Sequence, residues 1–341
     1  MESAAVQSPK AESPPPMSLD LFDPWLLLAA LCLDAVLGEP TRVYRWVPHP
    51  VVVCGGVIAR VERHANRPER SAIRRRLAGI GLTLALLVGG VWLGMLLEWG
   101  LSAAPVPSVM EIAAVAVLLA GRSLHDHVAD VATALRRDDA HEARRMVARI
   151  VGRDVRCLDT AGVARAAIET LAENASDGVV APALFYLIFG LPGLLAYKAI
   201  NTADSMIGHK TLRYRDFGWA AARLDDMLNY IPARATAALL AVAAIDPGWR
   251  TRPIRRAFAT ARREARRHAS PNAGWPEAAM AGGLGLRLGG PRAYGAMAMA
   301  GAWFGAGRRD ATAADIDAAL AVYRRALALL AFATLALAVM L

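Results

Sequence analysis

The chain has 341 residues, of which 55% are hydrophobic and 20% charged, and its mean hydropathy of +0.32 is too apolar for a typical soluble domain. The formal net charge is +9, but only 6% of the residues are aromatic and no nucleic-acid-binding motif is present, so the basic balance does not indicate a nucleic-acid partner. The cysteines lie too far apart in sequence to suggest a disulfide framework or a zinc site: Cys32, Cys54 and Cys157.

The chain begins with a polar, proline-rich segment, residues 1–18, which we expect to be a disordered tail. The rest, residues 19–341, is expected to form a single membrane-embedded domain. Several apolar segments are candidates for crossing a membrane, although each is short or marginal against the roughly 20 residues that a helical span needs. These candidate spans lie at about 21–37, 77–97, 106–120 and 326–341.

The arginines between these spans predict which side of the membrane each connection faces. The connection between the first two spans and the segment after the third are rich in arginine, whereas residues 98–105 contain neither Lys nor Arg. Because basic connections stay in the cytoplasm, residues 40–76 and everything after Gly121 are predicted to be cytoplasmic, with the tail outside. This pattern is typical of a multi-pass protein of the cell inner membrane.

Two further apolar runs, 179–197 and 235–245, do not fit simple spanning, because basic segments flank both. The first is interrupted by Gly190, Pro192 and Gly193, and we interpret it as a re-entrant or interfacial hairpin that forms a wall of a site. Irregular backbone at membrane depth is tolerated only where protein or a cavity covers it. The alternative is a plain helix–turn–helix in a soluble lobe. The second run is interpreted as a buried helix.

No segment of useful length alternates as a strand does, whereas other segments have helical periodicity or composition. Those segments are 141–150, 161–173 and 254–268. A C-terminal helix is predicted to begin at Thr312, with Asp315 three residues later as in a capping box. The expected fold class is therefore all-α, with about four spanning helices, additional re-entrant or buried helices and a large cytoplasmic helical part.

The most informative stretch runs from Glu169 to Lys210 and combines polar groups with a membrane-grade apolar run. Ionisable groups beside lipid are energetically costly and usually functional. On an α-helix, Glu169, Glu173 and Asp177 have i, i+4 and i+8 spacing and share one face. Oxygen ligands without His or Cys suit Mg²⁺, so this face is predicted to bind Mg²⁺ together with substrate phosphates. The alternative is a solvated charged face.

A second polar cluster follows the apolar run. The chain has only three lysines, and two of them, Lys198 and Lys210, stand at the two ends of this cluster. Lysines are normal partners of phosphate groups. Between them, Asn201, Asp204 and Ser205 supply an amide, a carboxylate and a hydroxyl. The cluster is therefore a candidate site for phosphate binding and for acid–base chemistry.

Three other parts of the chain place polar residues in defined settings. Asp225 and Asn229 lie one helical turn apart. Asn272 and Trp275 belong to a proline-containing loop that leads into a predicted helix. His49 stands in a proline-flanked loop, where it is either structural or a ligand contact.

Taken together, these segments resemble a family of membrane enzymes of cobalamin biosynthesis, the adenosylcobinamide-phosphate synthases, also called cobinamide synthases. Each segment alone would be weak, but they occur in family order and cover most of the chain from Leu33 to about Gly290, so the set is specific. The polar tail before Met17 and the arginine-rich segment 250–268 depart from the family pattern and touch no motif. The matching segments are LDAVLGEP with PHPVVVCG, GRSLHDHV, IVGRDVRCLD, ETLAENASDGVVAP, YKAINTADSMIGHK, LDDMLNYIPAR and PNAGWPEAAMAGGLGLRLGG.

The resemblance implies an ATP-dependent ligase that joins a propionic carboxylate of adenosylcobyric acid to (R)-1-amino-2-propanol or to its O-phosphate. ATP and Mg²⁺ are the implied cofactors. The implied partners are the corrinoid, the aminopropanol and the lipid bilayer, with no nucleic acid. Association with other corrinoid-pathway enzymes and the choice between the free and the phosphorylated amine are left open.

The residues in the matching segments give three groups of expected site residues. The expected Mg²⁺ ligands are Glu169, Glu173 and Asp177. The groups expected to orient or deprotonate the amine or to neutralise phosphates during catalysis are Lys198, Asn201, Asp204 and Asp225. The groups expected to contact the corrinoid or ATP are His49, Asn174, Ser205, Lys210, Asn272 and Trp275.

Two other functions are compatible with a polytopic membrane chain. A family of signalling membrane proteins linked to β-lactamase induction resembles these synthases distantly, but a sensor would not need the full set of acids and lysines found here. A transporter with a midplane site would be expected to carry inverted repeats, and the sequence contains no internal repeat.

Overall fold

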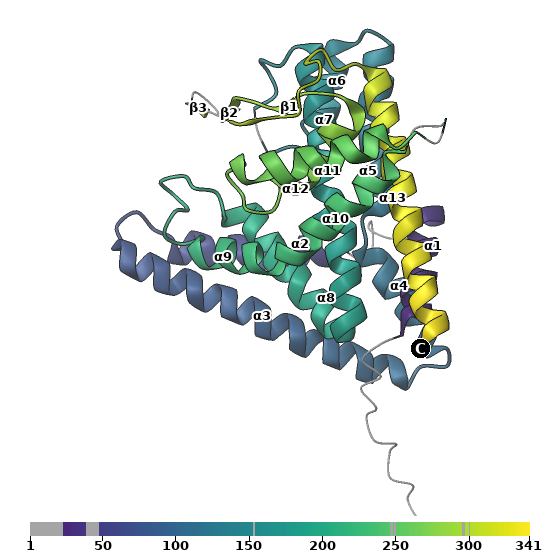
Figure 1. The fold of residues 1–341 in the computed structure, drawn as a ribbon. Coiled ribbons are helices and arrows are strands. Elements are labelled where there is room, and N and C mark those ends of the chain that lie inside the picture. The colour runs from purple at the N-terminus through teal and green to yellow at the C-terminus, as the bar shows by residue number, and fades with distance from the viewer. Residues whose placement is uncertain are drawn as a thin grey trace, which may run out of the picture.

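The computed structural model describes residues 23–38, 48–152, 154–245, 248, 250–294, 297–299 and 301–341. About 75% of the structure is helical and strands are few and short, so the predicted all-α fold class is confirmed. The expected tail, residues 1–18, lies outside the described residues. Figure 1 shows a long helix along the lower edge, a second long helix along the right edge, and a body of shorter helices between them.

The helices follow one another along the chain, and the segment between α12 and α13 contains the strands. Their bounds are α1 Pro24–Leu37, α2 Pro50–Ala65, α3 Ala72–Ser102, α4 Pro107–Leu118, α5 Gly121–Arg136, α6 Ala140–Val147, α7 Thr160–Ala175, the π-helix η2 Ser176–Val180, α8 Ala181–Ile207, α9 Trp219–Leu228, α10 Tyr230–Ala243, α11 Arg252–Glu264, the 3₁₀ helix η3 Ala265–Arg267, α12 Gly274–Leu284 and α13 Ala313–Met340. The strands are β1 Leu288–Gly289, β2 Arg292–Tyr294, β3 Met297–Met299 and β4 Trp303–Phe304, with β1 antiparallel to β4 and β2 antiparallel to β3.

The segments predicted as helices from periodicity are helical in the structure. Segment 141–150 contains most of α6, segment 161–173 lies within α7, and segment 254–268 covers most of α11 and all of η3. The predicted N-terminus of α13 is also confirmed. Thr312 and Asp315 form a capping box, in which the Thr312 amide donates to Asp315 Oδ2 at 2.7 Å.

In the described residues, four helical stretches are long and apolar enough to cross a membrane; three of them overlap expected spans and one does not. They are Ala72–Ser102, Pro107–Arg136, Thr160–Ile207 and Ala313–Met340. The first predicted span corresponds to α1, which has only 14 residues and is shorter than the roughly 20 residues that a span needs. The segment 179–197, interpreted above as a hairpin, lies within the third stretch, and its path relative to the membrane stays a prediction.

The predicted break inside 179–197 is present at Gly190. This residue has φ 62° and ψ −156°, which lie outside the helical region and are readily adopted only by glycine. The next amide, that of Leu191, donates to Glu98 Oε1 of α3 at 2.9 Å. A straight helix of 48 residues would be about 72 Å long, far more than the ~30 Å of a bilayer core. The break at Gly190 divides this stretch into two shorter helices.

Close packing of α3 against α8 depends on glycines in α3. A methyl group added at Gly94 would lie 2.3 Å from Cα of Pro192, and one added at Gly90 would lie 2.7 Å from Cα of Ala196. Small residues of this kind let two apolar helices approach until their backbones touch. The contact fixes the second half of α8, which carries part of the site.

The helix α7 packs against α5, α12 and α13, and the π-helix η2 that follows it packs against α10. Figure 1 shows α7 in the upper part of the body. Most side chains of α7 are buried, including Ile168 and Leu171, which are fully covered. A buried helix without an exposed face holds its polar residues at fixed positions. Any polar group that follows α7 is therefore positioned by the core and not by solvent.

Candidate functional site

The π-helix η2 determines where Asp177 lies. The chain changes from α-helix to π-helix between Ala175 and Ser176, and returns to α-helix at Ala181. The prediction that Glu169, Glu173 and Asp177 share one face of a continuous α-helix was therefore wrong in this respect, because a π-turn adds a residue and shifts the phase. Such turns occur frequently at functional sites.

One face of α8 points at α9. Tyr197, Asn201 and Asp204 have i, i+4 and i+7 spacing, which places them on the same side of the helix. Asp225 follows on α9, and Asn229 comes directly after the end of that helix. Asp177 lies within electrostatic range of Asp225, Glu173 and Asp204. We refer to Glu173, Asp177, Asp204 and Asp225 as the carboxylate centre.

A chain of hydrogen bonds holds Asp225. The amide of Asn201 donates to its Oδ1 at 3.2 Å, and the amide of Asn229 donates to its Oδ2 at 3.0 Å. The Tyr197 hydroxyl lies 2.9 Å from Asn229 Oδ1, to which it donates, and 3.2 Å from the backbone oxygen of Asp177. Each oxygen of the Asp225 carboxylate thus has a fixed donor, so its orientation is determined by two helices.

The environment of Asp225 changes its acidity. Burial raises the pKa of this carboxyl to about 6, and the charges of Asp226 and Glu173 act in the same direction. The hydrogen bonds from Asn201 and Asn229 oppose this change because they favour the ionised form. A carboxylate with a pKa near neutral pH is suited to accept a proton during a reaction.

The two lysines occupy different positions. Lys198 is partly buried on α8, one residue after Tyr197. Lys210 is exposed after the end of α8, where its Nζ lies 3.5 Å from the backbone oxygen of Ala269. Burial raises the pKa of the nearby Asp226, and the charges of Arg223 and Lys210 counter this effect. Ser205 is exposed near the C-terminal end of α8.

Three of the other expected site residues have structural contacts. Glu169 is buried, and its Oε1 accepts a hydrogen bond from the Gly289 amide of β1 at 2.8 Å. Asn174 donates to the Thr170 carbonyl oxygen of its own helix at 3.0 Å. His49 caps α2, and its Nε2 lies 3.1 Å from the Val117 carbonyl oxygen, which ties α2 to α4. Their predicted roles in ligand binding remain predictions.

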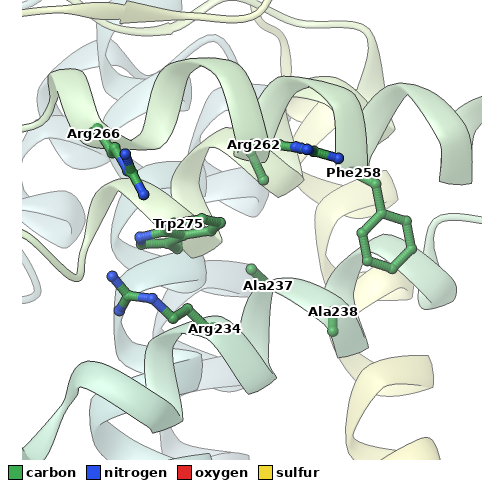
Figure 2. A pocket seen from close by; sticks show the side chains of 8 residues that line it. Arg234, Ala237, Ala238, Phe258, Arg262, Arg266 and Trp275 are labelled. Atoms are coloured by element: carbon green, nitrogen blue, oxygen red, sulfur yellow. The ribbon is translucent and has the colours of Figure 1, made fainter.

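Asn272 connects the carboxylate centre with a neighbouring hollow. Its amide donates to the backbone oxygen of Asp226 at 2.8 Å, and its Oδ1 lies 3.3 Å from Nη1 of Arg234. Arg234 and Trp275 line a hollow of about 690 Å³ between α10, α11 and α12, together with Arg262 and Arg266 (Figure 2). We refer to this hollow as the arginine pocket.

The chemistry of the carboxylate centre fits Mg²⁺. All of its donors are carboxylate oxygens, the type that Mg²⁺ prefers, and this ion commonly takes only one or two carboxylates and completes its shell with water and phosphate oxygens. Among the described residues, no group of three or more His, Cys, Asp or Glu side chains forms a metal-ligand set. Of the three expected ligands, Glu173 and Asp177 belong to the carboxylate centre, whereas the Glu169 carboxylate accepts a hydrogen bond from β1. Binding of Mg²⁺ stays a prediction.

Sequence reasoning missed several residues of this site. Tyr197 stands in the motif that also contains Lys198 and Asn201, but it lies at the end of an apolar run, and composition alone assigns it to that run. Its spacing of four from Asn201 was the available signal. The sequence also contained a signal for the arginine pocket. Phe258, Arg262 and Arg266 are spaced by four residues, which places them on one face of a helix.

Comparisons with known proteins give a consistent result. A sequence model of the family described as CobD/Cbib protein matches residues 27–323. The chain is 53% identical over 300 residues to the cobalamin biosynthesis protein CobD of Brucella anthropi, covering 87% of this chain and 91% of that protein. It is 46% identical over 310 residues to the CobD protein of Rhizobium meliloti, covering 90% and 94%. No solved structure matches this chain.

Proposed function

This chain belongs to the CobD/Cbib family of cobalamin biosynthesis, and from that premise we propose that it is an ATP-dependent ligase. The proposed reaction joins a propionic carboxylate of adenosylcobyric acid to (R)-1-amino-2-propanol, or to its O-phosphate, through an amide bond. The observation that supports a reaction here most directly is the fixed carboxylate of Asp225, which is held by two amides and surrounded by further acids.

The two substrates do not condense unaided at neutral pH. A carboxylate is a poor electrophile, and an alkyl amine, whose pKa in water resembles the ~10.4 of a lysine side chain, is protonated. ATP supplies a leaving group, because transfer of its terminal phosphoryl group to a carboxylate oxygen makes the acyl carbon electrophilic. The amine nitrogen then bonds to that carbon, the C–O bond breaks, and inorganic phosphate leaves with the oxygen.

In this reaction Asp225 takes a proton from the ammonium group. Its carboxylate is fixed by Asn201 and Asn229, so it presents a defined oxygen to the amine. General-base assistance of this kind typically accelerates a reaction by ~10²–10⁴-fold. Asp204, on the facing side of α8, is the alternative base, and Asn201 orients the amine.

The charges of the phosphate groups require positive partners. Glu173 and Asp177 would hold Mg²⁺, which would neutralise the phosphate oxygens and align them for transfer. Lys198 and Lys210 would supply further positive charge from the two ends of the motif, as lysines do at other phosphate sites. Asn174 and Ser205 are proposed to assist in binding ATP.

The corrinoid is proposed to lie against the carboxylate centre from the side of the loop before α12. Asn272 belongs to this loop and contacts Asp226 beside Asp225, and Trp275 lies in the first turn of α12. His49 is proposed as a further contact. The reaction is placed on the cytoplasmic side of the inner membrane, because the arginine-rich connections are predicted to lie there.

The test uses the full chain purified in detergent, with adenosylcobyric acid, Mg-ATP and either aminopropanol or its phosphate. Corrinoid mass and nucleotide release are followed together. We expect an ATP-dependent mass gain equal to amide formation, larger with one of the two amines. No product with either amine, in a folded preparation that binds corrinoid, would favour a sensor or a transporter instead.

The same assay tests the site. Asp177→Asn and Lys198→Ala are expected to abolish turnover, because the first removes a Mg²⁺ ligand and the second removes a phosphate partner. Both variants should elute as the folded protein does, because Asp177→Asn keeps the size of the side chain and Lys198 is only partly buried. Full activity in both variants would overturn the assignment of roles while leaving the reaction itself intact.

A further inference from the structure

The arginine pocket brings three cationic side chains to one hollow. Arg234 comes from α10, Arg262 from α11 and Arg266 from η3, and Figure 2 shows all three lining the hollow around Trp275. Within the described part of the chain, neither Arg262 nor Arg266 has a side-chain hydrogen bond or an ion pair with a protein group. The lining thus has three positive charges and no acid.

Arg234 is held in place for binding. Its guanidinium lies 3.5 Å from the ring centroid of Tyr230 and 4.8 Å from that of Trp275, and its Nη1 donates to the Tyr230 carbonyl oxygen at 2.6 Å. Burial lowers the pKa of Arg234, and the like charge of Arg266 lowers it further. This repulsion would be relieved by an anion between the two guanidinium groups.

A further donor in the pocket lacks a partner. The indole Nε1 of Trp275 is buried and has no hydrogen-bond partner, although an indole N–H normally finds one when it is removed from water. An unpaired buried donor costs free energy, and a bound acceptor oxygen would remove that cost. In the described part of the chain, the indole N–H and the guanidinium groups of Arg262 and Arg266 are thus donors without a protein acceptor.

We propose that the arginine pocket is a binding site for a phosphate group, separate from the carboxylate centre. Guanidinium groups recognise phosphate with paired N–H donors, and a dianion matches several converging cations better than a carboxylate does. The remaining lining is apolar, with Phe258, Ala237 and Ala238, so the phosphate belongs to a ligand with an uncharged portion. Both a soluble phosphate ester and the head group of an anionic phospholipid have this chemistry.

The proposal concerns binding and does not require the proposed reaction, although the pocket shares Trp275 with the proposed corrinoid contacts. Its position nevertheless suggests a connection between the two sites. Asn272 contacts Arg234 on one side and the backbone of Asp226 on the other. A shift of Arg234 on anion binding would therefore also shift the backbone next to Asp225.

The test measures binding of a phosphate probe to the full chain. A soluble probe is followed by titration calorimetry, and a lipid is followed by the unfolding temperature. One arm uses inorganic pyrophosphate with protein in detergent, and the other compares protein in nanodiscs of phosphatidylcholine alone with nanodiscs that contain phosphatidylglycerol. We expect saturable binding in at least one arm. Binding of pyrophosphate would identify a soluble ligand, whereas an effect confined to phosphatidylglycerol, read as a rise in unfolding temperature, would identify a lipid head group.

The chain offers a matched pair of variants. Arg262→Ala/Arg266→Ala should weaken binding at least tenfold, equivalent to about 1.4 kcal/mol. Arg263→Ala/Arg267→Ala removes the same charge from the same two elements but leaves the pocket intact, and should change binding less than twofold. Trp275→Phe, which keeps a ring and removes the N–H, should weaken binding severalfold. Equal losses in the two double variants, or no saturable binding in either arm, would overturn the proposal.

Discussion

At the scale of single residues, the site is defined by how one carboxylate is held. Asp225 is buried, and both of its oxygens accept hydrogen bonds from amides that are themselves fixed by helices. Its folded-state pKa of about 6 lies above the ~3.9 of an unfolded Asp. Between these values the folded state binds more protons, so the contribution of this group to the free energy of unfolding falls as pH rises through about 6.

The same raised pKa predicts the pH dependence of activity. If Asp225 accepts the proton of the amine, it must be ionised, so kcat/KM should rise as pH increases through about 6. Asn201→Ala removes a donor that favours the ionised form, and should move this rise to higher pH by about one unit. The measurement is a pH–rate profile of both proteins.

Asp225→Asn provides the control for this profile. It keeps the shape of the side chain and removes the base, so activity should fall by ~10²–10⁴-fold. A profile of Asn201→Ala that coincides with that of the unaltered protein would show that another group controls the rise.

At the scale of elements, the position of α8 depends on α3. The second half of α8 carries Tyr197, Asn201 and Asp204, and it lies against glycines of α3 that leave no room for a side chain. The break at Gly190 lets the chain change direction before this half begins. Two local features, a glycine contact and a glycine break, therefore determine where the polar face of α8 meets α9.

This packing predicts opposite effects for two similar substitutions. Gly94→Ala would place a methyl group 2.3 Å from Cα of Pro192, so α3 and α8 must separate, and the unfolding temperature in detergent should fall by several degrees. Gly89→Ala lies in the same helix with nothing within 4 Å, and should stabilise the helix by about 0.5–1 kcal/mol. Equal unfolding temperatures for the two variants would contradict this account of the α3–α8 contact.

At the scale of the whole molecule, the buried body and the membrane helices are continuous. The stretch from Thr160 to Ile207 is both a candidate membrane span and the element that carries Glu173, Asp177 and Asp204. More than half of its most apolar window is covered by the rest of the protein, compared with 22% for the stretch Ala72–Ser102. The helical stretch that carries the site is thus the one whose apolar window the protein covers most.

The distribution of arginine predicts how the molecule is oriented. The turn between α3 and α4 should lie outside the cytoplasm, and the connection after α5 should lie inside. In a variant without Cys32, Cys54 and Cys157, a cysteine placed at Ala103 should react with a membrane-impermeant maleimide in spheroplasts. A cysteine placed at Arg137 should react only after the membrane is opened. Labelling of Arg137→Cys in sealed spheroplasts would contradict the predicted orientation.

The amino-acid sequence by itself determined the class of the protein, the positions of most helices and the family. Apolar runs, helical periodicity and the capping box at Thr312 are local features. They favour helix formation without contacts from distant segments of the chain. The sequence also indicated the segment, Glu169 to Lys210, in which polar residues lie beside a long apolar run. It did not indicate that Glu169 is engaged by the Gly289 amide of β1, because that contact joins segments 120 residues apart.

Only the tertiary structure decided how these polar residues are grouped. The π-turn at η2 changes the phase of a helix, and a pattern based on 3.6 residues per turn cannot anticipate it. The network of Tyr197, Asn229 and Asp225 and the arginine pocket both arise where helices from different parts of the chain meet. Such groupings depend on how the buried faces of several helices pack together, and packing is a property of the whole fold.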